Sequence, residues 1–251
     1  MMNRTIEVIK DHRSTRDYKA DKIEESVINE IIVAAQSMPN SINGQQTSII
    51  VVQDDKTKAA IAEYAGGQPW IDQAPLFLLF VTDFYKTNLA AKKNGITQQI
   101  HASVESTVVG AVDVGLNMGA AIIAAESLGL GIVPIGGIRN NPQGIIDLLN
   151  LPEMTFPVAG LAIGYPNSES RKKPRLSLNT FRHDEKYQTE HLEKEIDDYD
   201  LLMVDYLKEI NRSQEINWST HTSTHTSSVY QHVYFPKVHP VMNKQGFTND
   251  K

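Results

Sequence analysis

Apolar positions recur with helical spacing in some stretches of the chain and in strand-like runs in others, and turn-forming residues separate the two. Apolar side chains three and four positions apart predict helices over residues 5–12 and 24–37. Proline, asparagine and glycine then predict a loop over 38–46, and the apolar, β-branched residues 47–53 predict a strand. The chain therefore begins with two helices, a loop and a strand.

Further elements follow in a mixed order. They are a helix over 55–64, a loop over 65–70, a strand over 75–82, helices over 84–94 and 101–128, a strand over 131–135, a loop over 136–142, a helix over 143–150 and a strand over 155–163. The strand over 75–82 is apolar at nearly every position, so we expect both of its faces to be covered. Helices and strands in this order predict an α+β sandwich.

The composition changes near residue 191. From there the chain shows a charged helical pattern, then a tract of serine, threonine and histidine over 219–228, then an irregular tail. We therefore expect a main domain over 1–190 and an arm over 191–251 that forms no second core.

The segment 108–125 is almost entirely apolar or small, a pattern that also occurs in membrane spans. A span needs about 20 mostly apolar residues, and an acidic group at its centre is costly. Asp113 and Asn117 interrupt this segment. We therefore predict a buried helix at an oligomer interface.

Charge and cysteine content narrow the function. The formal net charge of -6 offers no broad basic surface, so neither nucleic acid nor an anionic membrane is an expected partner. The chain has no cysteine, so any redox chemistry must use a bound cofactor. Residues 1–18 lack the continuous apolar core of a secretory signal, and a cytoplasmic protein is expected.

Two short basic clusters are candidates for binding an anion. HRSTR at 12–16 follows the first predicted helix, and RKKPR at 171–175 follows the last predicted strand. Guanidinium and hydroxyl donors this close together fit an anion, although basic residues also complement the dipole at solvated helix ends. Pro174 stiffens the spacing of Lys173 and Arg175, so both side chains could face one anion. The clusters can cooperate only if the fold joins them.

Five motifs together resemble the oxygen-insensitive, NADPH-dependent nitroreductase and flavin reductase family. They are HRSTR at 12–16, NSINGQ at 40–45, GGQPWI at 66–71, GLGIVPIGGIRN at 129–140 and KKPR at 172–175. The resemblance implies an α+β, nitroreductase-like fold with a central mixed or antiparallel sheet flanked by helices. It also implies an intertwined homodimer in which each FMN lies at the subunit interface and touches both chains.

The resemblance, carried over motif by motif, also implies a set of FMN-binding residues. They are His12, Arg13, Ser14, Arg16, Ser41, Gln45, Gln68, Pro134, Ile135, Gly136, Gly137, Lys173 and Arg175. The FMN phosphate carries close to two negative charges, and its contacts would be His12, Ser14, Lys173 and Arg175. Arg13 falls in the same segment, and Arg16 would reach the pyrimidine edge of the flavin, where a cation stabilises the charge of the reduced ring.

The remaining contacts in this set have structural alternatives. Ser41 and Gln45 would reach the flavin from the partner subunit and Gln68 would lie beside the ring, but the surrounding residue types are also ordinary turn formers. Pro134 to Gly137 would run past the ring and offer backbone N–H groups to it. Paired glycines allow that close approach, although they also suit a turn at the end of a strand.

The carboxy-terminal arm departs from the family pattern. NRSQEINWS at 211–219 only loosely resembles the segment that grips the nicotinamide cofactor, and Arg212 is its candidate for the 2′-phosphate of NADPH. NADPH is the expected electron donor, with NADH as the alternative. His221 and His225 stand four positions apart like a metal pair, but serine and threonine argue against a helix there and a third ligand is missing. We therefore expect no metal site.

The implied function is an FMN-dependent oxidoreductase with a ping-pong mechanism, in which the nucleotide donates hydride and leaves before the acceptor enters. Expected acceptors are nitroaromatics, quinones, azo compounds and free flavin. No side chain is expected to act as an acid or base, because the flavin carries the chemistry. The alternatives are a flavin-binding or storage protein, another flavin enzyme on the same scaffold, and a non-catalytic dimer.

Overall fold

The computed structural model describes residues 3–212, 216–227 and 235–251. Its contacts divide the chain into two compact units, here called the main unit (Met1–Ser170 with Val233–Lys251) and the second unit (Arg171–His232). The contacts thus change at residue 171, and the end of the chain belongs to the main unit. The division at residue 190 stays a prediction about domains.

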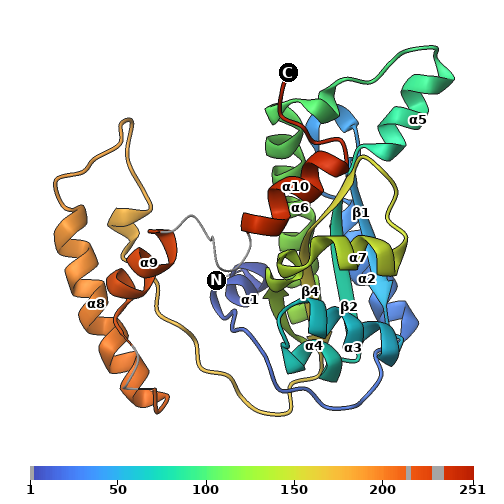
Figure 1. Ribbon diagram of the computed structural model, residues 1–251. Helices are drawn as coiled ribbons and strands as arrows, with labels where there is room; N and C mark the ends of the chain where they lie inside the picture. Colours follow the sequence, from blue (N-terminus) through green and yellow to red (C-terminus); the bar gives the residue numbers. More distant parts are fainter. Residues whose placement is uncertain (1–2, 213–215, 228–234) are drawn as a thin grey trace. The chain divides into compact units, whose positions relative to one another are not determined.

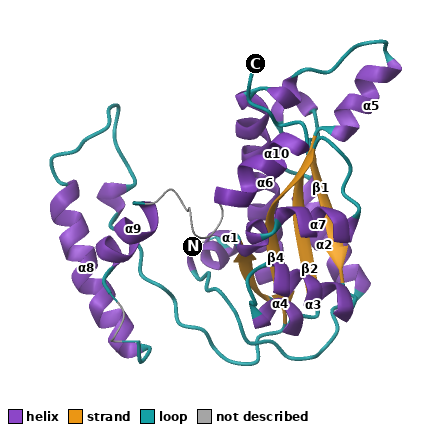
Figure 2. Ribbon diagram, in the orientation of Figure 1, coloured by secondary structure: helices purple, strands orange, loops and turns teal. Residues whose placement is uncertain are grey.

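A four-stranded antiparallel sheet forms the centre of the main unit (Figure 2). Its strands are β1 (Thr47–Val52), β2 (Leu76–Asp83), β3 (Gly131–Ile135) and β4 (Thr155–Gly164), in the spatial order β1-β2-β4-β3. Every neighbouring pair is antiparallel. The predicted class, an antiparallel sheet flanked by helices, is confirmed, and β3 lies at one edge of that sheet.

Helices cover both faces of the sheet (Figure 1). One face packs against α3 (Asp55–Tyr64), α4 (Pro69–Gln73) and α7 (Pro142–Leu149), and the other against α2 (Glu25–Gln36) and α6 (Val104–Ser127). Side chains alternate along a strand, so Phe77 and Leu79 of β2 lie in the first layer and Leu78 and Phe80 in the second. All eight residues of β2 are buried, as its continuous apolar pattern predicts.

Helix α6 contains the apolar segment 108–125, and by length and composition alone it could cross a membrane. In the structure it packs against α2 and the sheet, and Asn117 Nδ2 donates to the carbonyl oxygen of Ala35 at 2.6 Å. On the side away from the sheet, the apolar side chains at every fourth position are exposed: Val104, Val108, Val112 and Leu116. The helix is therefore a core helix with one uncovered apolar face.

The chain after residue 191 contains more regular structure than its pattern predicts. The charged segment forms α8 (Leu192–Glu209), and its Tyr199, Met203 and Leu207 make a small apolar cluster within the second unit. The expectation of an irregular tail is wrong for α10 (Phe235–Lys244). Two prolines in its sequence argue against a helix. Its apolar side chains nevertheless lie on one helical face and pack with Phe84 and Phe156 of the main unit.

Candidate functional site

The segment that carries HRSTR lies along the outer edge of β3. It follows α1 (Arg4–Lys10), Ser14 forms a parallel bridge with Ile132, and Thr15 N–H donates to the Ile132 carbonyl oxygen at 2.8 Å. A Cβ atom at Gly131 would lie 2.4 Å from Thr15 Oγ1, so glycine is needed for this approach. Two of the predicted motifs, far apart in sequence, are thereby brought together.

Tyr18 fixes the other end of this segment. Its buried hydroxyl donates to the carbonyl oxygens of Thr15 at 2.7 Å and Ala162 at 3.2 Å. Burial raises the pKa of Tyr18 above its ordinary range, with Arg16 opposing that shift, so the hydroxyl remains a donor. Nearby, Asp17 accepts from Ser168 Oγ at 2.6 Å and from Asn167 Nδ2, and these hydrogen bonds lower the pKa of its carboxyl group.

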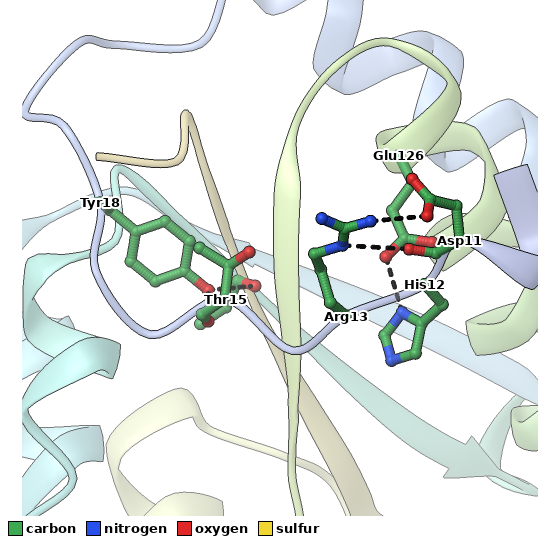
Figure 3. A network of polar contacts seen from close by, with 7 residues as sticks. Asp11, His12, Arg13, Thr15, Tyr18 and Glu126 are labelled. Carbon is green, nitrogen blue, oxygen red and sulfur yellow. Dashed lines mark hydrogen bonds and ion pairs between the residues drawn. The ribbon is translucent and has the colours of Figure 1, made fainter. Parts of the chain in front are cut away.

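Carboxylates contact the first two side chains of HRSTR, His12 and Arg13 (Figure 3). Glu126 Oε1 lies 2.6 Å from His12 Nδ1, and the Arg13 guanidinium pairs with Asp11 at 2.6 Å and Glu169 at 2.9 Å. A pocket of about 440 Å³ is lined by these carboxylates and Arg13, among other residues. Arg13 is thus engaged by two acidic partners, and its role at a phosphate stays a prediction.

GGQPWI and GGIRN meet at one backbone carbonyl group. The Ala65 oxygen accepts from Gln68 Nε2 at 3.1 Å and from Asn140 Nδ2 at 3.2 Å. A Cβ atom at Gly137 would lie 2.2 Å from Gln68 Nε2 and 2.5 Å from the Ala65 oxygen, so only glycine fits there without a shift. Gln68 is therefore held against the turn that follows β3.

The end of β3 itself has one uncovered position. Pro134 is exposed, whereas the other four residues of this strand are buried. Ile135 points into the core, so any part it has in binding would involve its backbone. Pro134 is thus the exposed position of the strand, and Gly136, just after the strand, is half-buried.

Arg16 and Trp70 bring the first and third motifs together. The guanidinium carbon of Arg16 lies 5.5 Å from the centre of the Trp70 ring, within the range of a cation–π interaction. Trp70 belongs to α4, which begins at Pro69 inside the segment predicted as a loop. Arg16 is exposed, so its charge remains accessible to a ligand.

The NSINGQ loop adopts a strained backbone next to α6. Ile42, Asn43 and Gln45 have φ values of 50°, 56° and 51°, in the left-handed region that a β-branched residue such as Ile42 rarely enters. The Ser41 N–H donates to Asp113 Oδ1 at 3.2 Å, and Asp113 is buried in α6. The loop is therefore anchored to the helix whose outer face is apolar.

The second basic cluster belongs to the second unit. Lys173 and Arg175 are exposed, and Arg175 Nη1 donates to the Lys173 carbonyl oxygen at 2.9 Å. The Pro174 carbonyl oxygen accepts from the Tyr199 hydroxyl at 2.9 Å. Cooperation of this cluster with HRSTR stays a prediction. Residues 213–215, in the expected nicotinamide segment after Arg212, lie outside the described residues.

The prediction that residues 219–228 avoid a helix was wrong, although Ser228 lies outside the described part. Residues Trp218–Thr226 form α9, which the Asn217 side chain caps by accepting from Thr220 N–H. Hydroxyl groups along the helix donate to carbonyl oxygens one turn back, which satisfies them locally. The rings of His221 and His225 stack 4.1 Å apart. Among the described residues, no group of three or more His, Cys, Asp or Glu could hold a metal ion.

The main unit offers donors and surfaces that fit a flavin mononucleotide. The segment 12–16 supplies a hydroxyl, an imidazole and an exposed guanidinium, and the strand edge beside it is uncovered at Pro134. The donor set thus fits a phosphorylated, partly anionic, planar cofactor.

Comparison with known proteins places the chain in a family. It matches the nitroreductase family over residues 9–165 and the C-terminal domain of that family over 173–250. A curated relative from Bacillus subtilis strain 168, named FMN reductase [NAD(P)H], is 45% identical and both chains are fully covered. The chain belongs to the nitroreductase family.

Solved structures agree with this assignment. The structure of Bacillus megaterium NfrA2 is 46% identical with a TM-score of 0.94, and both chains are fully covered. NADPH:FMN oxidoreductase from Vibrio harveyi, solved with NAD+, is 33% identical with a TM-score of 0.85 and covers 98% of this chain and 99% of its own. The similarity extends over both units of the chain.

The sequence gives little indication of several side chains that position these motifs. Asp113 is visible as a charge inside an apolar helix, and Glu126 as a charge just before a glycine-rich strand start. Trp70 lies within a recognised motif, but its pairing with Arg16 depends on tertiary structure. Nothing in the pattern around Tyr18 indicates that its hydroxyl is buried.

Tyr18→Phe tests how firmly HRSTR is fixed. Loss of the hydroxyl leaves two buried carbonyl oxygens without this donor, so the free energy of unfolding should fall by about 1–2 kcal/mol. Urea unfolding of the apoprotein at fixed protein concentration measures this change. Tyr85→Phe, at an exposed position, is the matched control and should have little effect. Equal stability of wild type and Tyr18→Phe would show that the hydroxyl does not hold the segment.

Proposed function

We propose that this chain is an FMN-dependent NAD(P)H oxidoreductase that reduces nitroaromatics, quinones or free flavin by ping-pong hydride transfer. The observation that carries the proposal is the meeting of HRSTR, GGQPWI and GLGIVPIGGIRN at the edge of β3. Relatives named FMN reductase [NAD(P)H] and NADPH:FMN oxidoreductase support the same activity.

FMN, when bound, supplies a ring that accepts hydride from a nicotinamide and passes it to an acceptor. The protein's own part is to bind, orient and stabilise. Arg16 would place positive charge near the pyrimidine edge of the ring and stabilise its reduced form. Gln68 and the backbone N–H groups near Gly136 and Gly137 would orient the ring, and no side chain is required as an acid or base.

The phosphate of FMN is assigned to His12 and Ser14 together with Lys173 and Arg175, with Arg13 in the same segment. Support comes from the chemistry of these donors, because hydrogen bonds between charged donors and phosphate are shorter and stronger than neutral ones. Arg212 is assigned to the donor nucleotide, with NADPH preferred over NADH. A cytoplasmic location fits this dependence on reduced nucleotides.

A homodimer completes the proposed site. Val108, Val112 and the rest of the exposed row on α6 form an apolar face that a second copy would cover. The strained loop that carries Ser41 and Gln45 is anchored to the same helix through Asp113, and Ile42 at its tip is 89% exposed. Ser41 and Gln45 would then reach the FMN of the partner subunit, and the arm after residue 191 would help complete the dimer and the nucleotide site.

The activity is tested by spectroscopy without oxygen. Protein reconstituted with FMN should show flavin absorption that bleaches on addition of NADPH, with slower bleaching by NADH. The absorption should return when menadione or nitrofurazone is added. Bands that never bleach would instead identify a flavin storage protein, and failure to bind FMN at all would refute the proposal.

Val112→Asp tests the dimer. A buried, unpaired carboxylate at the proposed interface is costly, so this variant should shift the protein towards monomer in sedimentation velocity. Leu89→Asp, at an exposed apolar position on α5 (Tyr85–Lys93), is the matched control and should stay dimeric. A wild-type monomer, or an unchanged dimer in Val112→Asp, would contradict the proposed interface.

A further inference from the structure

Glu126 is a largely buried carboxylate near the end of α6, and it contacts the first residue of HRSTR. Its side chain is 12% exposed, and Oε1 lies 2.6 Å from His12 Nδ1. Within the described part of the chain, Oε2 is buried and has no hydrogen-bond partner. A carboxylate that is desolvated to this degree destabilises the fold unless it is paired, so the contact with His12 matters for both groups.

The contact with Glu126 fixes the orientation of the His12 ring. With Nδ1–H donated to Glu126, the second ring nitrogen, Nε2, lies on the side of the ring away from the carboxylate (Figure 3). The His12 side chain is 25% exposed, so a ligand can approach it. When both ring nitrogens carry hydrogen, Nε2–H is free to donate to an anion while Nδ1–H stays on Glu126.

The backbone of HRSTR does not depend on this contact. Thr15 is hydrogen-bonded to Ile132, and Tyr18 closes the end of the segment. The neighbouring Arg13 is held separately, by its ion pairs with Asp11 and Glu169. The Glu126 contact therefore acts on the orientation of one side chain, and its loss should leave the path of the main chain intact.

Charge alone does not explain anion binding here. Asp11, Glu126 and Glu169 lie beside His12 and Arg13, so the carboxylates offset the local positive charge. A phosphate would be repelled by Glu126 unless an oriented donor stood between the two groups. His12 is placed to be that donor.

We propose that Glu126 is a positioning residue that orients His12 towards a phosphate monoester, and that this pair makes the site prefer FMN over riboflavin. The inference rests on the proposed function, because the phosphate contact of His12 is part of that proposal. Glu126 itself does not contact the phosphate and acts on the preference for FMN through His12.

The ratio of riboflavin to FMN dissociation constants tests the proposal, measured by flavin fluorescence on the full-length apoprotein. Glu126→Ala should weaken FMN binding roughly 10-fold or more, as expected for loss of one well-oriented hydrogen bond to a charged group. Riboflavin, which lacks the phosphate, should bind with unchanged affinity. Glu126→Gln keeps an acceptor for Nδ1–H and should recover much of the preference. Glu105→Gln, at the other end of the same helix, is the control and should match wild type.

Coupling to His12 separates this inference from the proposed function. In a His12→Ala background, Glu126→Ala should cause no further loss of preference. If His12→Ala leaves the ratio unchanged, the phosphate assignment itself fails. If His12→Ala lowers the ratio but Glu126→Ala weakens FMN and riboflavin equally, Glu126 is merely structural and the inference is overturned.

If Glu126→Ala does not fold, Glu126→Gln decides. A partial loss of the preference for FMN that is absent in the His12→Ala background supports the pair. A loss that adds to that of His12→Ala refutes it.

Discussion

The main chain of Ser14 and Thr15 pairs with the outer edge of β3 at Ile132, and the HRSTR segment is positioned through that pairing. The hydrogen bond from Thr15 to Ile132 sets the register, and the Tyr18 hydroxyl fixes the end. Because β3 is an edge strand, its outer backbone groups are available to pair with this segment. Ser14 is thereby placed at the edge of β3, and Arg16 follows it two positions on, over the Trp70 ring.

Helix α6 links the two halves of the proposed site. Glu126 contacts His12 of the phosphate segment, and Asp113 accepts from the backbone of the loop that carries Ser41. Both carboxylates lie on a helix whose outer face is apolar and exposed. A second copy packed on that face would bring one chain's loop towards the other chain's flavin, which is why cofactor binding and dimer formation are expected to depend on each other.

The elements that sequence patterns predict well are those in which a single physical effect dominates. Burial on both faces makes β2 continuous in apolar residues, and turn chemistry marks Asn141 and Pro142 at the start of α7. In contrast, α10 combines an apolar face with an internal Pro240, so only its packing against Phe84 and Phe156 reveals it. Hydroxyl groups of α9 bond back to its own carbonyl oxygens, a compensation that composition does not indicate.

The candidate site shows the same limit. The motifs identify Arg16 and Gln68, but the interactions that hold them, with Trp70 and with the Ala65 carbonyl oxygen, join residues through tertiary structure. A pattern also cannot show that Arg13 is already paired with two carboxylates. Residue types thus predict which groups can bind a flavin, whereas the hydrogen bonds decide which of them are oriented to do so.

Trp70 provides the most direct test of where the cofactor binds. The chain has two tryptophans, so in a Trp218→Phe variant the emission reports Trp70 alone. If the flavin lies over Arg16, titration of the apoprotein with FMN should quench most of this emission and saturate at one FMN per chain. Emission that persists when FMN is fully bound would place the cofactor away from the edge of β3 and contradict the account.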